Sequence, residues 1–179
     1  MTYYGAKELA DSFRTVRNNT ILVAEDIPEV KYSFAAASGV RTVEKLLTHI
    51  ALAYRFNHQL HGVEKRTTLE GFNFPALMQQ MVEEEAKPRS KAEVLELLRN
   101  EGEVWAGFVS ALPEDVLAET ILMPPGATPP ARTRFDMILS VKEHEMHHRG
   151  QLMMIERMLG IVPHLTRQMQ ARMARAQQR

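Results

Sequence analysis

The sequence predicts an all-α protein, a four-helix bundle formed by one domain over residues 1–179. Four long stretches place apolar residues three and four positions apart, which is the spacing of an amphipathic helix. Connections that contain proline or glycine separate these stretches. No stretch alternates with a period of two for long enough to build a sheet. Four such helices in a chain of 179 residues are typical of a bundle with a single core.

Composition excludes several classes of protein and of site. Apolar residues make up 45% of the chain and charged residues 25%, as in an ordinary soluble globular protein. The chain has no cysteine, so disulfides and thiolate metal ligands are excluded. The net charge of zero argues against a general nucleic-acid binder, and no apolar run approaches the roughly 18 residues that cross a membrane. Without a signal peptide, we expect a cytoplasmic protein with no nucleic-acid or membrane partner.

The first half of the chain predicts two long helices. Residues 5–25 have helical apolar spacing, and the helix ends before Pro28. Residues 27–39 predict a loop. Thr42 is the expected N-cap of a second helix, which continues to Gly62 without a break.

The middle of the chain predicts a short helix and a third long one. Residues 63–73 are polar and predict a loop, and residues 74–85 predict a short helix. Ser90 is the expected N-cap of the third long helix, which Pro113 ends. Residues 113–117 predict one further helical turn.

The last third predicts a proline-rich loop followed by the fourth long helix. Four prolines in residues 124–130 exclude a helix there. Thr133 is the expected N-cap, with Asp136 completing a capping box, and the helix runs to about residue 159. The tail after about residue 163 is interpreted as either a short basic helix or a disordered segment.

The fourth helix presents two histidines on its core-facing side. His144 and His148 are four residues apart and therefore lie one turn apart on one face, whereas His147 is rotated away and is the weaker ligand candidate. His49, on the second helix, is the best candidate for a third ligand. Gln151 lies near the inner face and could hold a ligand or a water. The stripe that contains the two histidines consists of Met137, Val141, His144, His148, Leu152, Ile155 and Leu159.

Three neutral imidazoles from two helices would leave open coordination positions on a divalent ion, as in a catalytic site. Such ligands suit zinc, nickel, iron or cobalt. The alternative is that these histidines are buried core groups that bind backbone carbonyls.

Other side chains carry secondary expectations. Leu139, Met146 and Met153 form a second apolar stripe, for which we expect either a two-fold homodimer partner or a neighbouring loop as cover. The glutamates at positions 83–85 and Glu145 are expected to be solvated. Arg149 is expected to point away from the core, and His164 and Glu143 are expected at the surface.

Two segments together resemble the DinB-like family of bacteria. They are RTVEKLLTHI at residues 41–50 and HEMHHRGQL at residues 144–152. The resemblance implies a four-helix bundle in which His49, His144 and His148 bind a divalent metal ion, often nickel or zinc, in a chain that is often dimeric. The family includes bacillithiol- and mycothiol-dependent transferases.

Three functional hypotheses follow. The first is a metal-dependent enzyme with a small-molecule substrate, either a thiol S-transferase that uses a low-molecular-weight thiol or a hydrolase. The second is a non-catalytic, stress-associated metal-binding or interaction protein. A protein of this second kind would have a metal site closed to solvent, with a fourth protein ligand and no adjoining cavity. The third is that the histidines are structural core groups.

Overall fold

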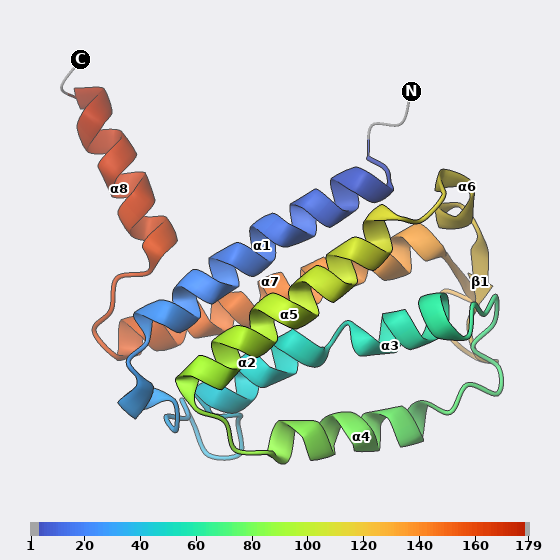
Figure 1. Ribbon diagram of the computed structural model, residues 1–179, viewed down its shortest axis with the longest axis horizontal. Helices are drawn as coiled ribbons and strands as arrows, with labels where there is room; N and C mark the ends of the chain where they lie inside the picture. The colour runs from blue at the N-terminus through green and yellow to red at the C-terminus, as the bar shows by residue number, and fades with distance from the viewer. Residues whose placement is uncertain (1–3, 178–179) are drawn as a thin grey trace.

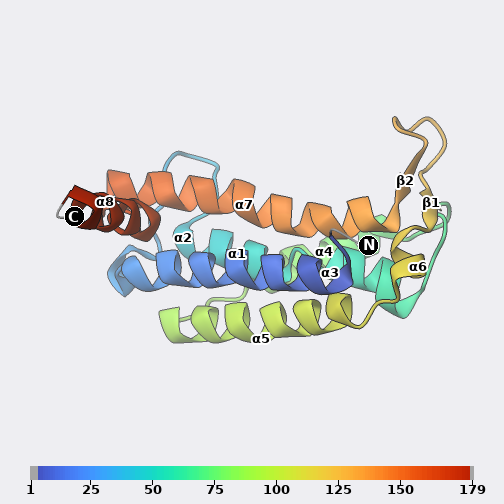
Figure 2. The ribbon, with the colours of Figure 1, turned by 90° about the horizontal axis from the view of Figure 1, so that it is seen from above.

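The protein folds as an all-α four-helix bundle, seen here in a computed structural model that describes residues 4–177. Helices α1 and α2 each pack against α5 and α7, so α1 and α2 occupy one diagonal of the bundle and α5 and α7 the other. Figure 2 shows α1, α5 and α7 side by side along their length. The predicted fold class is therefore confirmed. The bundle helices are α1 (Ala6–Asp26), α2 (Val43–Leu52), α5 (Lys91–Ser110) and α7 (Arg134–Met158).

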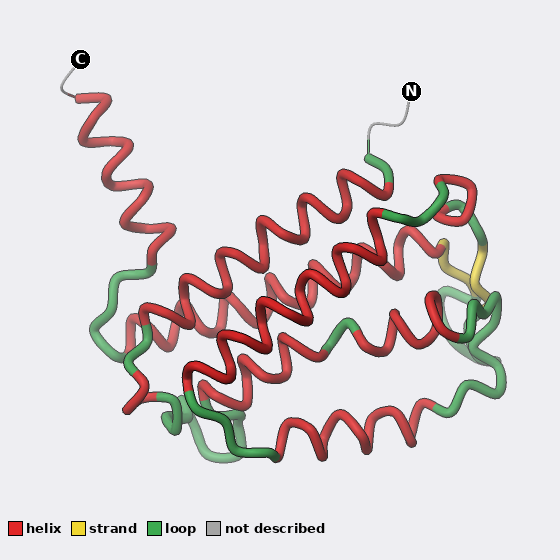
Figure 3. Tube along the Cα trace, viewed as in Figure 1, coloured by secondary structure: helices red, strands yellow, loops and turns green. Residues whose placement is uncertain are grey.

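Shorter elements surround the bundle (Figure 3). α4 packs against α2, and α8 leaves the end of α7 at an angle and contacts α1 (Figure 1). α8 shows that the described part of the basic tail is helical. No helix within residues 4–177 is long and apolar enough to span a bilayer. These elements are η1 (Glu29–Lys31), α3 (Arg55–His58), the π-helical η2 (Gln59–Val63), α4 (Phe74–Ala86), α6 (Glu114–Leu117), β1 (Thr120–Leu122), β2 (Ala131–Thr133) and α8 (His164–Gln177).

Local capping explains where three bundle helices begin. The hydroxyls of Thr42, Ser90 and Thr133 each accept a hydrogen bond from the backbone amide three residues further on. These caps are as predicted. The Asp136 carboxylate is bound instead by Arg132, at 2.5 Å, so the predicted capping box at the start of α7 is only half formed.

A short hairpin closes the proline-rich loop, which the sequence analysis did not anticipate. β1 and β2 pair antiparallel, with Ile121 opposite Arg132, and the loop between them contains residues 124–130. Ile121 is fully buried, which anchors the hairpin to the bundle. Strands of three residues are too short to show the period-two alternation that predicts a sheet.

The prediction of one continuous helix from Thr42 to Gly62 is wrong, because α2 ends at Leu52. Nη2 of Arg17 donates to the carbonyl oxygen of Ile50 at 3.2 Å. In an unbroken helix that oxygen would accept from the amide of Tyr54, four residues on. A side chain inserted into the helical ladder interrupts it, and the chain continues through α3 and η2.

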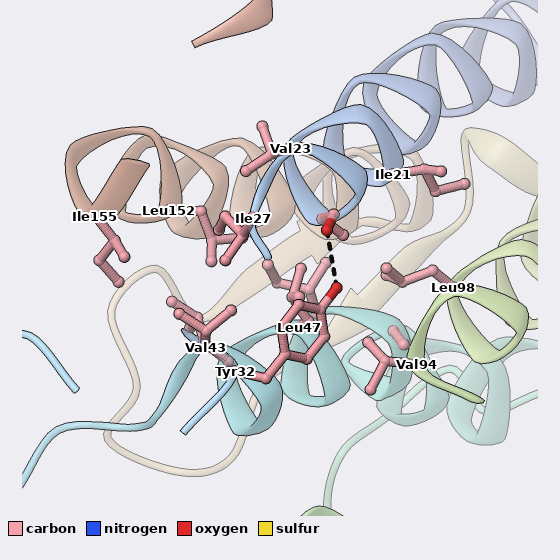
Figure 4. Packing of buried hydrophobic residues seen from close by; sticks show 14 residues of the cluster. Ile21, Val23, Ile27, Tyr32, Val43, Leu47, Val94, Leu98, Leu152 and Ile155 are labelled. Carbon is pink, nitrogen blue, oxygen red and sulfur yellow. Dashed lines mark hydrogen bonds between the residues drawn. The ribbon is translucent and has the colours of Figure 1, made fainter. Parts of the chain in front are cut away.

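The core consists of two main apolar clusters at opposite ends of the bundle. Figure 4 shows the first, which includes Leu47, Leu98 and Leu152, together with the hydrogen bond from the hydroxyl of Tyr32 to the carbonyl of Ala24. Trp105 is the largest buried residue of the second. On α1, α5 and α7 the two clusters are contributed by different segments, whereas α2 contributes only to the first.

Between the clusters lies a buried ion pair that joins all four bundle helices. Nε of Arg17 on α1 lies 3.0 and 3.1 Å from the carboxylate oxygens of Glu145 on α7. Its Nη1 donates to the carbonyl of Leu98 on α5 at 2.7 Å, and its Nη2 binds α2 as described above. A Cβ at Gly102 would lie 3.0 Å from Arg17 Cγ, so glycine makes room for the side chain. The expectation that Glu145 is solvated is therefore wrong.

Replacing Arg17 by alanine should destabilise the fold strongly. The change leaves the Glu145 carboxylate buried without its cation, which typically costs about 3–5 kcal/mol. Arg14→Ala is the matched control, because Arg14 forms solvent-facing ion pairs on the same helix and should cost less than about 1 kcal/mol. Urea unfolding of both variants measures the difference. Equal losses in the two variants would contradict the role assigned to Arg17.

A second buried carboxylate lies at the C-terminal end of α7. Glu156 is fully buried, and neither of its carboxylate oxygens has a hydrogen-bond partner within residues 4–177. Burial, and then the charge of Asp26, raises the pKa of Glu156 to about 7. Nearby, His164 is 4% exposed with Nε2 3.1 Å from Oδ1 of Asn19, so the expectation that it is exposed is wrong.

Glu156 should make stability depend on pH. Because the folded protein binds this proton more tightly than the unfolded chain, its contribution is complete below pH 4.5 and is lost as the pH rises through about 7. Glu156→Gln should remove this loss and be more stable than the wild type at pH 8 by about 1–3 kcal/mol, with little difference at pH 5. Denaturant unfolding at the two pH values measures this. Glu143→Gln, at an exposed position of the same helix, is the control.

Candidate metal centre

Three histidines from two bundle helices meet at one point. Thr42 starts α2 so that His49 falls in its second turn, and His144 and His148 lie one turn apart on α7. Nε2 of His144 lies 3.2 Å from Nε2 of His49 and 3.1 Å from Nε2 of His148. The structure thus brings together the three residues singled out in the sequence.

Neighbouring side chains orient two of the rings. Nδ1 of His49 lies 2.5 Å from Oε1 of Glu85 on α4, and Nδ1 of His148 lies 2.8 Å from Oε1 of Gln151. Since a carboxylate or amide oxygen accepts, each Nδ1 carries the proton and each Nε2 presents its lone pair to the cluster. Glu85 is held in turn by Nε of Arg41, at 2.8 Å.

The electrostatics of the cluster favour neutral imidazoles beside a charged carboxylate. Burial, and then the imidazoles of His148 and His49, lowers the pKa of His144 to about 4. Burial is also the main cause that lowers the pKa of His148, and the hydrogen bond to Gln151 opposes it. Burial alone would raise the pKa of Glu85, but His49 and Arg41 outweigh it and lower that pKa. At neutral pH His144 and His148 are therefore neutral imidazoles, the form that binds metal.

The geometry can hold one divalent ion. Histidine nitrogens about 2.0–2.1 Å from a common ion lie roughly 2.8–3.4 Å apart at neighbouring octahedral or tetrahedral positions. The two spacings from Nε2 of His144 fall in that range, and the ligand nitrogens of all three histidines lie within 4.8 Å of one another. Within residues 4–177, the ligand group contains these three histidines and no fourth His, Asp or Glu. Three protein ligands leave positions for a water or substrate. His148 and Glu85 also line a cavity of about 780 Å³.

The structure also gives the positions of the other polar residues near the histidines and of one histidine outside the cluster. His147 is outside the cluster and exposed, with Nε2 3.2 Å from Nε2 of Gln151, so it contacts the residue that orients His148. Gln151, expected near the inner face, is exposed, and its Oε1 lies 2.8 Å from Nδ1 of His148. Arg149 is half-buried and donates to the carbonyl of Val16 at 3.4 Å, so it does not simply point to solvent. His61 is buried elsewhere, where it accepts from Arg134 at 2.7 Å.

The second apolar stripe of α7 is not one exposed face. Leu139 and Met153 pack against the two core clusters, whereas Met146 is 45% exposed. The protein's own core therefore covers two of the three residues of this stripe.

Sequence reasoning missed Glu85 and Arg41. Glu85 was grouped with its acidic neighbours as a solvated residue, which is wrong. A usable signal was its position four residues after Met81, because this spacing places it on the buried face of α4. Arg41 carried no comparable signal, since it precedes the cap of α2.

The sequence and the fold of this chain are similar to those of known proteins. A model of the DinB superfamily matches residues 12–152, a range that contains all three histidines. A DinB-like protein from Bacillus subtilis, YjoA, is 21% identical, with a TM-score of 0.62 over 86% of this chain and 92% of its own. YfiT from Bacillus subtilis, described as a probable metal-dependent hydrolase with an unusual four-helix bundle topology, is 14% identical, with a TM-score of 0.65 over 90% and 91%. No curated protein matches the chain.

Replacing Glu85 by glutamine should weaken zinc binding by about 10–100-fold. Loss of a carboxylate behind a histidine ligand removes the partner that fixes its tautomer and raises its basicity. Glu83→Gln is the matched control, because Glu83 lies on the same helix, is exposed and contacts Gln79. Competition with a chromophoric chelator measures both affinities. Unchanged zinc affinity in Glu85→Gln would show that Glu85 does not support His49.

Proposed function

The chain belongs to the DinB superfamily, and on that basis we propose that it is a metal-dependent enzyme whose His49, His144 and His148 hold one divalent ion. The observation that carries the proposal is the convergence of three imidazole Nε2 atoms beside a ligand-sized cavity, whose wall includes His148. Zinc and nickel are the ions we propose, since both suit a site built from imidazoles.

A bound ion would supply Lewis-acid activation of a water or of a thiol. The protein's own residues perform the remaining tasks. Glu85 keeps the Nδ1 proton of His49 in place, Arg41 holds Glu85 in position, and Gln151 does for His148 what Glu85 does for His49. The apolar part of the cavity wall lies on one side of the site.

The activated group would be either a water, in a hydrolase, or a low-molecular-weight thiol, in an S-transferase. Hydrolysis is the activity attributed to YfiT, whose fold this chain shares. Thiol transfer needs the same open coordination positions. We therefore propose one site chemistry, nucleophile activation, with these two reactions as its forms. Cytoplasmic location and assembly into a two-fold homodimer stay predictions.

The non-catalytic alternative requires a different site. A purely storing or structural metal centre would be sealed and would have a fourth protein ligand. The ligand group within residues 4–177 has three members, and a cavity of about 780 Å³ adjoins it. These observations support the enzyme over the binding protein.

His148→Ala should abolish stoichiometric binding of zinc or nickel, while His147→Ala should keep most of it, because only His148 points its Nε2 into the cluster. Elemental analysis and metal titration of purified protein measure this. The zinc-loaded wild type should also hydrolyse simple esters or amides, or join a thiol to an electrophile, and His148→Ala should lose that turnover. Equal metal loss in the two variants would refute the ligand assignment. Full metal binding without turnover in any assay would support the non-catalytic alternative.

A further inference from the structure

The cavity beside the histidines has a polar end and an apolar body. Its polar wall is one connected group, in which Arg41 binds Glu85 and Gln151 binds His148. Its apolar wall comes from the segment before α2, from α2, from α4 and from α7. The apolar lining residues are Ala36, Val40, Leu46, Val82, Met154, Ile155 and Met158.

The two parts follow one another along α7. His148 and Gln151 come first, and Met154, Ile155 and Met158 continue toward the C-terminal end of the helix. The ten residue steps from His148 to Met158 rise about 15 Å at 1.5 Å per residue. The cavity therefore leads away from the proposed ion along α7 for about that length, and its lining on this helix is apolar from Met154 onward.

Much of this apolar wall is uncovered. Val40 is 51% exposed, Val82 59%, Met154 60% and Met158 54%. Four such side chains gathered around one cavity are unusual for a solvated surface and mark a place where an apolar ligand can be buried. The volume of about 780 Å³ lies within the range of small-molecule sites.

The charges in the cavity wall do not favour a ligand whose body is ionic or strongly polar. Arg41 and Glu85 neutralise one another at 2.8 Å, and every lining residue beyond Gln151 on α7 is apolar. Methionine side chains adapt their shape to what they contact, so Met154 and Met158 suit ligands of varied outline.

We infer that the substrate is a compound with an uncharged alkyl or aryl body of roughly six to ten carbon atoms, whose reactive group sits at the histidine end of the cavity. This inference rests on the proposed function for the position of the reactive group, but the apolar subsite itself does not need the ion. Continuity of the cavity with His148 and its small volume favour a small molecule over a second copy of the chain.

A series of straight-chain hydroxamic acids tests the inference, because each has the same metal-binding head and a different apolar chain. Acetohydroxamic acid through decanohydroxamic acid are titrated calorimetrically into the full chain, both loaded with zinc and free of metal. We expect the affinity to rise about three- to fourfold per added methylene until the apolar wall is covered. Zinc should raise every affinity by a similar factor without changing the increment per methylene.

Two substitutions test where the alkyl chain of the hydroxamic acid binds. Val82→Asn and Met154→Gln should each weaken binding of the octyl and longer compounds about five- to tenfold and leave acetohydroxamic acid and zinc stoichiometry unchanged. Val104→Asn and Met173→Gln are matched controls, since these residues are similarly exposed on α5 and α8, at 52% and 57%, and lie outside the cavity wall. Both controls should bind the whole series like the wild type.

The outcomes separate this inference from the proposed function. Stoichiometric zinc binding with affinities independent of chain length would overturn the inference and leave the metal site standing. A chain-length dependence without zinc binding would support the apolar subsite and overturn the proposed metal enzyme. Sedimentation that shows dimers dissociated by Val82→Asn or Met154→Gln, with no effect on the hydroxamate series, would assign the apolar wall to a second copy and overturn the inference.

Discussion

The guanidinium of Arg17 is the contact on which the arrangement of the bundle depends. It binds a carboxylate on α7 and backbone carbonyls on α5 and α2, all between two apolar clusters. Two of its partners adjoin the proposed ligands, because Glu145 follows His144 and Ile50 follows His49. Holding Glu145 toward the bundle axis turns His144 about 100° away from it, toward His49 on α2. The same side chain interrupts α2 just after His49. A buried ion pair of this kind adds little net stability over an apolar core, but it penalises any shift in register, since a shift would leave a buried charge unpaired.

A second layer of contacts turns the histidine cluster into an oriented site. Glu85 and Gln151 assign the proton of their histidine partners to Nδ1, so the lone pairs that converge are set before any ion arrives. Glu85 comes from α4, which is outside the four-helix bundle and packs on α2. The bundle therefore supplies the three ligands, while the added helix supplies the support for one of them and part of the cavity wall.

The fold is shared with YjoA and YfiT at identities of 21% and 14%, and a fold shared at that level does not carry a reaction with it. The side chains of the cavity bear on substrate choice more directly than the shared fold does. Its polar end is self-neutralised and its body is apolar, which restricts the substrates that gain free energy on binding. In the proposed enzyme, chemistry at the histidines and choice of substrate would be located in adjacent but separable parts of the molecule.

The sequence by itself determined the helices, three of their N-caps and the facing of His144 and His148, because these depend on residues within one or two turns of each other. It also indicated His49, first from its position on the second helix and then through resemblance to a family. Only the tertiary structure decided that Glu145 is buried against Arg17, 128 positions away, and that Glu85 reaches His49 across 36 positions. The break in α2 was also decided only by the tertiary structure, since its cause is a side chain on another helix. Local periodicity predicts which face of a helix is buried, but whether a charged residue on that face has a partner depends on the packing of distant segments.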